Sequence, residues 1–331
     1  MHCLCASKRA REDKLRGSVN RLIQAMQRLY LLDTMFFIHR AFHAVPELKA
    51  PCGSPINALY GVIGLLKTLW KLERFHHVVA VFESPQPSFR KVLDPEYKAN
   101  RSKPPVELRC QVAMVRVACE CLGIQTLHVD GYEADDVMGT LARHAVEVQQ
   151  DVTIVSNDKD LAQVLALSPR IELLRTSQNG RPERITSKEV SKMYGVPPEL
   201  ITSWLALRGD STDNIKGVKG IGQKTAVKLL TQQGDIHALL AEPEKAGRFA
   251  RAFREERERI LMDLDLATIR TDVELGPEGF PEDGYRLRPI DGAAEFFQDL
   301  GMMGQVRKLR ELGDSDSTIA DLWDEPQGWL G

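Results

Sequence analysis

The stretch Gly131-Tyr132-Glu133-Ala134-Asp135-Asp136 places three carboxylates within four residues. An apolar run over residues 124–129 precedes it and is typical of a buried strand. After it, Val137, Leu141 and Ala145 recur every four residues, which predicts a helix. The acids therefore lie in the first turn of a helix that follows a strand. Taken alone, the stretch is equally well explained as an acidic turn that complements the helix dipole.

Three other apolar runs in the chain also end in acids. Leu29–Leu32 leads to Asp33, His77–Phe82 leads to Glu83, and Val152–Val155 leads to Asp158 and Asp160. A helix is predicted between the first two, from about Ile56 to Leu72. Continuous apolar strands that alternate with helices predict an α/β fold with a parallel sheet flanked by helices. Ligands of such folds bind beyond the carboxyl ends of the strands.

These acids should therefore converge on one edge of the sheet. So many like charges cannot stay ionised without compensation, and hard divalent cations with oxygen ligands provide it. No His or Cys accompanies the acids at ligand spacing, so Mg²⁺ or Mn²⁺ is favoured over zinc. The alternative is that each acid caps its own helix, but four successive strand ends argue against coincidence. The acids of the proposed cluster are Asp33, Glu83, Glu133, Asp135, Asp136, Asp158 and Asp160.

The composition of the chain indicates its size class, its charge and the compartment in which it works. The 331 residues are 43% hydrophobic and 27% charged, enough for one or two domains with a sizeable core. A formal charge of −2 does not indicate nucleic acid, so local charge must carry that information. Six cysteines without a CxxC pair indicate reduced thiols in a cytosolic protein. No membrane-spanning run or secretory signal is visible.

Two further regions have the character of nucleic-acid contacts. Residues 88–109 contain six cations with Phe89 and Tyr97 interleaved, which suits a phosphate backbone and an unstacked base. A solvated loop of mixed charge is the alternative. Residues 209–226 hold four glycines and three lysines, and they follow a helix predicted over 198–207 and lead into another over about 223–233. The glycines permit a tight hairpin whose amides approach a phosphate, and Asp210 and Asp213 before it could face the metals.

With these motifs in order, the chain resembles the 5′-nuclease (flap endonuclease) superfamily, specifically the 5′-3′ exonuclease domain of bacterial DNA polymerase I. The resemblance covers about residues 28–312. Its motifs are Leu31-Leu32-Asp33, Arg40-Ala41-Phe42-His43, Pro95-Glu96-Tyr97-Lys98-Ala99-Asn100-Arg101, Gly131 to Asp136, Asp158-Lys159-Asp160-Leu161, Gly209 to Ala226, and Leu266-Ala267-Thr268-Ile269-Arg270-Thr271-Asp272-Val273.

The resemblance implies a PIN-like nuclease core with a helix-three-turn-helix DNA-binding subdomain, and hydrolysis by two Mg²⁺ or Mn²⁺ ions. Lys98 and Arg101 would act at the scissile phosphate, and the hairpin would also bind K⁺. The first metal group would be Asp33, Glu83, Glu133 and Asp135, and the second Asp136, Asp158, Asp160, Asp210 and Asp213, some through water. The DNA contacts would be Arg40, Arg90, Tyr97, Lys103, Lys216, Gly217, Lys219, Gly220, Gly222, Lys224 and Thr225.

The expected organisation follows the same resemblance. Residues 1–27 would be a flexible basic extension and 28–185 the nuclease core, including a basic arch over 85–110. Residues 186–312 would form the helical DNA-binding subdomain with its hairpin at 209–226, and 313–331 an acidic tail. We expect a monomeric, cytoplasmic bacterial protein at the nucleoid that acts on DNA with 5′ flaps, nicks or ends, alone or beside a separate DNA polymerase.

One departure leaves the activity open. The family usually has Asp where Glu83 stands, and the longer side chain could weaken metal coordination. A nuclease-like DNA-binding module is therefore one alternative to an active enzyme, and a ribonuclease with a related acidic core is another. The presence of the other acids argues against the first, and the arch and hairpin argue against the second.

Overall fold

A computed structural model describes residues 28–176, 181–276, 279–281, 283–312 and 317–323. Its centre is a sheet in the order β3-β2-β1-β4-β5-β6. The first five strands of this order are parallel, and β6 pairs with β5 in the antiparallel sense. The strands are β1 (Leu29–Asp33), β2 (His77–Val81), β3 (Gln125–Leu127), β4 (Val152–Val155), β5 (Ile171–Thr176) and β6 (Pro182–Ile185).

The sheet is buried on both faces, as the apolar strands predicted. Along β1, Leu29 and Leu31 point into one core, while Tyr30 and Leu32 point into the other. The first core is closed by α6 (Ala134–Glu147), the 3-10 helix η1 (Asp160–Ala166) and α7 (Ser187–Tyr194). The second is closed by α2 (Thr34–Ala44), α3 (Asn57–Glu73) and α5 (Val106–Cys121). The expected α/β class is confirmed, although β5 and β6 were not predicted.

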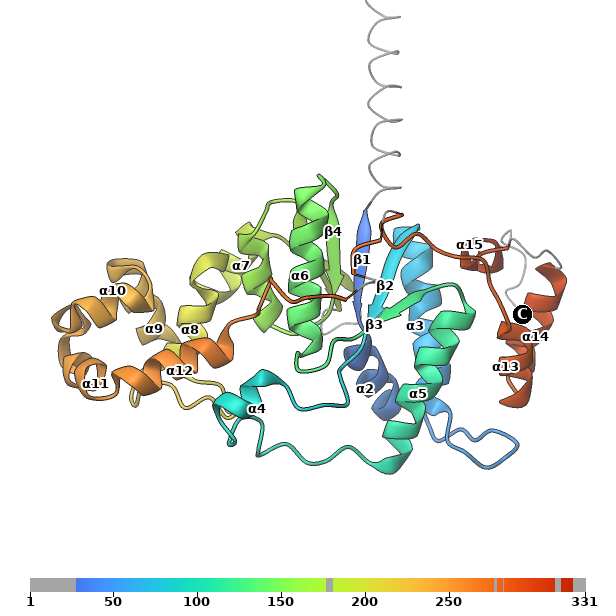
Figure 1. Cartoon of the computed structure of the whole chain (residues 1–331), viewed down its shortest axis with the longest axis horizontal. Coiled ribbons are helices and arrows are strands. Elements are labelled where there is room, and N and C mark those ends of the chain that lie inside the picture. The colour runs from blue at the N-terminus through green and yellow to red at the C-terminus, as the bar shows by residue number, and fades with distance from the viewer. Residues whose placement is uncertain (1–27, 177–180, 277–278, 282, 313–316, 324–331) are drawn as a thin grey trace, which may run out of the picture.

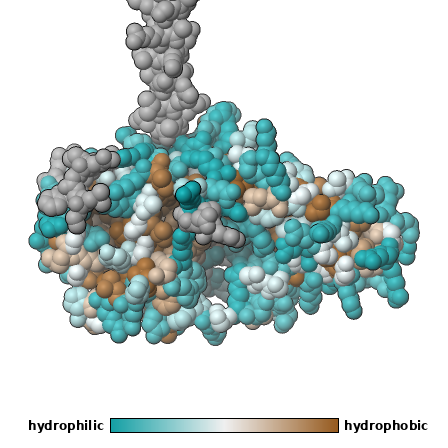
Figure 2. All heavy atoms as spheres, turned by 180° about the vertical axis from the view of Figure 1, so that it is seen from behind, coloured by the Kyte–Doolittle hydropathy of each residue, from teal (hydrophilic) through white to brown (hydrophobic). Residues whose placement is uncertain are grey.

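A helical region protrudes from one end of the sheet (Figure 1). The 3-10 helix η2 (Pro198–Leu200) leads into α8 (Ile201–Arg208), and the glycine-rich turn connects α8 to α9 (Gln223–Gln233). The two helices expected on either side of that turn are therefore present. The region is completed by α10 (Ile236–Ala241), η3 (Pro243–Phe249), α11 (Ala250–Glu255) and α12 (Arg257–Ala267). Hydrophilic side chains cover much of its surface in the view of Figure 2.

After α12 the chain returns across α6 to the far side of the core. Gly139 of α6 allows this crossing, because a Cβ there would lie 2.8 Å from the Ile269 side chain and 3.1 Å from the Arg270 carbonyl oxygen. The returning chain then forms α13 (Ala293–Asp299), α14 (Met303–Leu312) and α15 (Ile319–Trp323). Their buried side chains belong to the core that also contains α3 and α5, at the end opposite the protruding helices (Figure 1).

This return corrects two expected boundaries. Residues 293–312 pack on the nuclease core and are not part of the helical subdomain predicted over 186–312. The acidic tail predicted over 313–331 is also partly wrong, because Ile319, Leu322 and Trp323 are buried in the core. The basic extension predicted over 1–27 lies outside the described residues. Within the described part of the chain, Cys52, Cys110, Cys119 and Cys121 are free thiols, and no helix is long and apolar enough to cross a membrane.

Candidate active site

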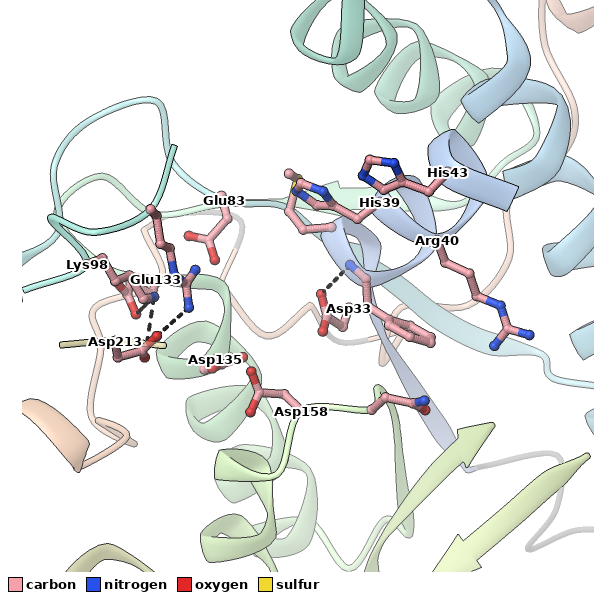
Figure 3. Close-up of a pocket in the computed structure, with 14 residues that line it drawn as sticks. Asp33, His39, Arg40, His43, Glu83, Lys98, Glu133, Asp135, Asp158 and Asp213 are labelled. Atoms are coloured by element: carbon pink, nitrogen blue, oxygen red, sulfur yellow. Dashed lines mark hydrogen bonds and ion pairs between the residues drawn. The ribbon is translucent and has the colours of Figure 1, made fainter. Parts of the chain in front are cut away.

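One cavity of about 730 Å³ lies at the carboxyl ends of the parallel strands. Asp33 is the last residue of β1, and Glu83 and Asp158 follow β2 and β4. The first turn of α6 supplies two more acids, and the turn before α9 supplies another. Figure 3 shows these acids around one space. The acidic lining residues are Asp33, Glu83, Glu133, Asp135, Asp158 and Asp213.

The arch residues hold Glu133 in place within this cavity. Ser88 donates a hydrogen bond to Glu133 Oε1 at 3.1 Å, and the Tyr97 hydroxyl donates to Oε2 at 3.1 Å. Lys98 Nζ lies 2.8 Å from the same Oε2 and 4.0 Å from Asp213 Oδ2. Arg101 makes an ion pair with Asp213 Oδ1. Lys98 and Arg101 therefore stand beside the acids, where the family resemblance expects them to act.

Burial and the repulsion between neighbouring carboxylates raise the pKa values of three other cavity acids, Asp33, Glu83 and Asp135. Burial raises the pKa of Asp33, although the hydrogen bond from Ser156 at 2.6 Å opposes the rise. Burial, followed by the charge of Asp158, raises the pKa of Asp135 well above its ordinary value. Glu83 is exposed at the rim, but its carboxyl group is crowded by protein, and this crowding and Glu133 raise its pKa. Such a set of oxygen donors fits hard divalent cations.

The donors are nevertheless not arranged as a closed chelate. Among the described residues, no three His, Cys, Asp or Glu side chains converge tightly enough to hold an ion by themselves. Mg²⁺ commonly keeps several water ligands and takes only one or two carboxylates directly. A divalent ion bound here would therefore complete its coordination shell with water.

The opposite wall of the cavity comes from α2 and is partly cationic (Figure 3). Phe36, His39, Arg40 and His43 recur at spacings of three and four residues and all line the cavity. Arg40 was predicted as a DNA contact, whereas His39 was not considered. The signal that could have found it is this helical spacing directly after the first strand-end acid.

Three predicted contacts are wrong because their side chains are occupied inside the protein. Asp136 is 0% exposed and Arg90 is 3% exposed, and the two form a buried ion pair at 2.6 Å. Asp136 therefore cannot serve as a metal ligand in this arrangement, and Arg90 cannot reach DNA. Tyr97 is 2% exposed and bridges Glu133 and Asp213 through its hydroxyl, so no base can stack on its ring.

Asp160 and Asp210 do not line the cavity directly, so their place in the second metal group, which allowed for ligands acting through water, stays a prediction. Lys159 Nζ lies between them, 3.1 Å from Asp160 Oδ1 and 2.5 Å from Asp210 Oδ2. Burial and Asp158 raise the pKa of Asp160 to about 7. These two acids neutralise a lysine in the structure, and any role at a metal would act through water.

The glycine-rich turn has the close backbone packing that its sequence implies. Gly217 has φ of 66°, and a Cβ there would lie 2.3 Å from the Gly209 nitrogen, so only glycine fits. Asp263 of α12 accepts a hydrogen bond from the Gly217 N–H at 3.1 Å and fixes the turn. Around the turn, Lys216, Lys219, Gly220, Gly222 and Lys224 are exposed and Thr225 is partly so; Lys103 of the arch is also exposed.

Fold and site together define a class: an α/β nuclease core with acids at the strand ends, joined to a helical region through a glycine-rich hairpin. The family assignment follows from the sequence itself. Residues 28–195 match the 5′-3′ exonuclease N-terminal resolvase-like domain, and residues 196–291 match the 5′-3′ exonuclease C-terminal SAM fold. The chain belongs to the 5′-3′ exonuclease family, and the class of enzyme predicted from its motifs is confirmed.

Curated relatives agree with this assignment. A 5′-3′ exonuclease of Aquifex aeolicus is 35% identical over 289 residues, covering 87% of this chain and 96% of that protein. DNA polymerase I of Pseudomonas aeruginosa is 41% identical over 259 residues, which are 76% of this chain. The match spans only 28% of that polymerase, so the chain corresponds to a minor part of its length.

Solved structures show the same fold at much lower identity. A bacteriophage T5 5′-exonuclease with bound divalent zinc has a TM-score of 0.63 and 18% identity, covering 83% of this chain and 98% of that one. A T5 flap endonuclease complex with DNA and metal ions also gives 0.63 and 18%, covering 84% and 99%. The α13–α15 helices lie beyond the region matched by the family models.

Proposed function

We propose that this chain hydrolyses phosphodiester bonds of DNA at 5′ ends, nicks and 5′ flaps, using two divalent ions. The observation that supports this most is the cavity in which acids from successive strand ends meet Lys98 and Arg101. Family membership fixes the class of reaction, whereas the substrate structure and the ions remain part of the proposal. Mg²⁺ is the preferred ion and Mn²⁺ the expected substitute, because the donors are oxygens.

The cavity acids would hold the ions, some of them through water. When bound, such ions polarise the scissile phosphate and lower the pKa of the attacking water. The residues of the chain position the ions and the DNA backbone relative to each other. Lys98 and Arg101 would balance the charge that develops on the phosphate, and Arg40 on the opposite wall would contact the adjoining backbone. The proposed ligands are Asp33, Glu83, Glu133, Asp135, Asp158 and Asp213.

The exposed hairpin would hold the duplex away from the chemistry. Its lysines and the start of α9 offer positive charge and free amides to backbone phosphates. We include K⁺ as a ligand of the hairpin backbone, to be detected as tighter duplex binding in K⁺ than in Na⁺ at equal ionic strength. The proposed unit is a monomer, which could act beside a separate DNA polymerase.

The decisive experiment compares labelled 5′-flap, nicked duplex, single-stranded DNA and RNA substrates in Mg²⁺, Mn²⁺ and EDTA. We expect short products from the 5′ end of flap and nicked DNA with either ion and none in EDTA. Binding without cleavage would instead identify a DNA-binding module silenced at Glu83. Preferential cleavage of RNA would identify a ribonuclease.

A further inference from the structure

The arch and the helical region are fastened to each other directly beside the cavity. Residues 96–101 of the arch and 211–214 of the turn before α9 form what we call the clasp. The Lys98 N–H donates to the Asp213 carbonyl oxygen at 2.9 Å. In the opposite direction, the Asn214 side-chain amide donates to the Glu96 carbonyl oxygen at 2.7 Å. Each segment thus supplies a donor to the main chain of the other.

Two more arch side chains complete the clasp. The Asn100 amide donates to the Ser211 carbonyl oxygen, and Arg101 Nε donates to the Thr212 carbonyl oxygen at 3.3 Å. All of these acceptors are main-chain carbonyls. The clasp therefore fixes the path of the backbone as well as the side-chain positions.

Both halves of the clasp contain a residue in an unfavourable backbone conformation. Lys98 has φ of 54° and Asn214 has φ of 60°, in the left-handed region that side chains other than glycine rarely occupy. Asparagine tolerates this region, but lysine occupies it only where the surroundings enforce it. The hydrogen bond from the Lys98 N–H to the Asp213 carbonyl oxygen stabilises this conformation of Lys98. The Asn214 side chain binds the same turn of the arch at Glu96, two residues before Lys98.

This conformation determines where the Lys98 side chain points. Its Nζ lies 2.8 Å from Glu133 and 4.0 Å from Asp213. A single residue, Ile215, separates Asn214 from the exposed Lys216 of the hairpin. A paired bridge between Asp210 and Ile215, with both hydrogen bonds at 2.8 Å, keeps that short connection rigid. A continuous set of contacts therefore joins the hairpin surface to the ammonium group in the cavity.

We infer that Asn214 is a positioning residue that couples duplex held on the hairpin to the placement of Lys98 over the acids. Asn100 serves the same clasp from the arch side. The inference rests on the proposed function, because it assumes that Lys98 acts on the scissile phosphate. A misplacement of about 1 Å at a reacting group can cost about 100-fold in rate, so a loosened clasp should be visible kinetically.

The test is a double-mutant cycle with Asn214→Gly and Lys98→Ala. Glycine at 214 keeps the left-handed backbone and removes only the amide donor. In single-turnover cleavage of saturating 5′-flap DNA, we expect Asn214→Gly to lower the rate about 10- to 100-fold. Duplex affinity, measured in Ca²⁺, should stay within about twofold of the original protein. In the Lys98→Ala background, Asn214→Gly should cause almost no further loss.

A second measurement does not depend on metal or cleavage. Hydrogen exchange of the Lys98 amide should quicken in metal-free Asn214→Gly, because its acceptor is no longer held. Asn100→Ala should act in the same direction in both measurements. Asp321→Ala, which removes the side-chain acceptor of the Thr318 N–H at the far end of the core, controls for a general loss of stability. It should leave the cleavage rate and the Lys98 exchange unchanged.

The outcomes separate the clasp from the proposed function. If the rate losses of Asn214→Gly and Lys98→Ala are additive in the double variant, the positioning role of Asn214 is overturned. The same holds if Asn214→Gly weakens duplex affinity and leaves the cleavage rate unchanged. Unchanged Lys98 exchange in Asn214→Gly would overturn it as well. If the original protein fails to cut, or Lys98→Ala cuts at the original rate, the proposed function fails first and the inference falls with it.

Discussion

Arg90 and Asp136 form a two-point ion pair in the interior, with Nη1 to Oδ2 at 2.6 Å and Nη2 to Oδ1 at 2.8 Å. Burial alone would lower the pKa of Arg90, but the carboxylate of Asp136 reverses that effect and raises it. Arg90 also donates to the carbonyl oxygens of Leu266 and Thr268 at the end of α12. The pair therefore ties the arch, the first turn of α6 and the helical region together.

The first prediction is that Asp136→Asn mainly destabilises the fold. The substitution leaves the buried guanidinium of Arg90 without its counter-charge, which typically costs about 3–5 kcal/mol in the free energy of unfolding. Urea unfolding in EDTA should show this loss, and any cleavage defect should follow the folded fraction. Asp158→Asn serves as the matched control, because Asp158 lines the cavity. Full stability of Asp136→Asn together with loss of metal binding would return Asp136 to the ligand set.

The second prediction is that substitution of the cavity acid Asp135 stabilises the metal-free fold, whereas substitution of Asp136 destabilises it. Asp135→Asn should abolish Mg²⁺-dependent cleavage and raise the melting temperature of the metal-free protein, because it removes a charge that Asp158 and Asp33 repel. Differential scanning fluorimetry in EDTA, paired with flap cleavage in Mg²⁺, measures both effects. A lower melting temperature in EDTA would show that Asp135 stabilises the fold and that the repulsion is compensated.

The third prediction concerns pH. Asp33, Glu83 and Asp135 have pKa values raised in the folded state, so folding favours their protonated forms. Their contribution to stability is complete below the unfolded pKa of about 4 and is lost as pH rises through the folded values. In EDTA, the melting temperature should therefore fall between about pH 5 and 8. Mg²⁺ should raise it more at pH 8 than at pH 5, and an equal effect at both would contradict this assignment of charge.

The apolar runs that end in acids were enough to predict the parallel sheet and the edge at which the site lies. The apolar run before Asp33 can only be buried between two helical layers, so the sheet, its parallel sense and the edge that bears the site followed from local pattern. By contrast, β5 and β6 were missed. The 3-10 helix η1 replaces a long crossover helix before β5, and Pro182–Ile185 is mostly exposed, so neither strand has a strong periodic signal.

The partner of each charge could not be predicted from spacing. Asp135 and Asp136 are adjacent, yet one faces the cavity and the other faces Arg90, which lies 46 positions away. The same limit explains Tyr97, whose hydroxyl is shared by acids from two different regions. Helical spacing places a side chain on a face, but only the tertiary fold decides whether that face meets solvent or a buried cation.

The fourth prediction concerns Glu83, where the resemblance led us to expect aspartate. Glu83 Oε2 accepts a hydrogen bond from the Ala134 N–H at 3.3 Å, a weak contact that does not lock the side chain. Glu83→Asp should therefore keep or raise the cleavage rate without changing duplex affinity. The measurement is single-turnover cleavage across a Mg²⁺ titration, with Glu83→Gln as the charge-removing control. A large loss in Glu83→Asp would mean that the site is built around the longer side chain.

The last prediction separates the residues that bind the duplex from the residue that acts in the chemical step. Lys216 and Lys219 are exposed on the hairpin, whereas Lys98 lies in the cavity with Glu133 and Asp213. A phosphate contact on the hairpin exists equally in the ground and transition states, so removing it should raise KM more than it lowers kcat. Each lost contact should also reduce the salt dependence of duplex affinity by about one unit of log–log slope. An interaction that strengthens as charge develops behaves differently, and Lys98→Ala should lower kcat by about 100-fold or more.

The comparison uses Lys216→Ala/Lys219→Ala, Lys98→Ala and the exposed control Lys71→Ala in single-turnover flap cleavage across a salt series. Lys71 lies in the last turn of α3, which leads into the start of β2 at the sheet edge opposite the acids, so its loss should change neither quantity. If the hairpin double variant loses its chemical step at unchanged affinity, or Lys98→Ala loses only affinity, the roles of the two basic regions are reversed. The expected separation would show that charge on the hairpin sets how long the duplex stays, while one ammonium group in the cavity sets how fast it is cut.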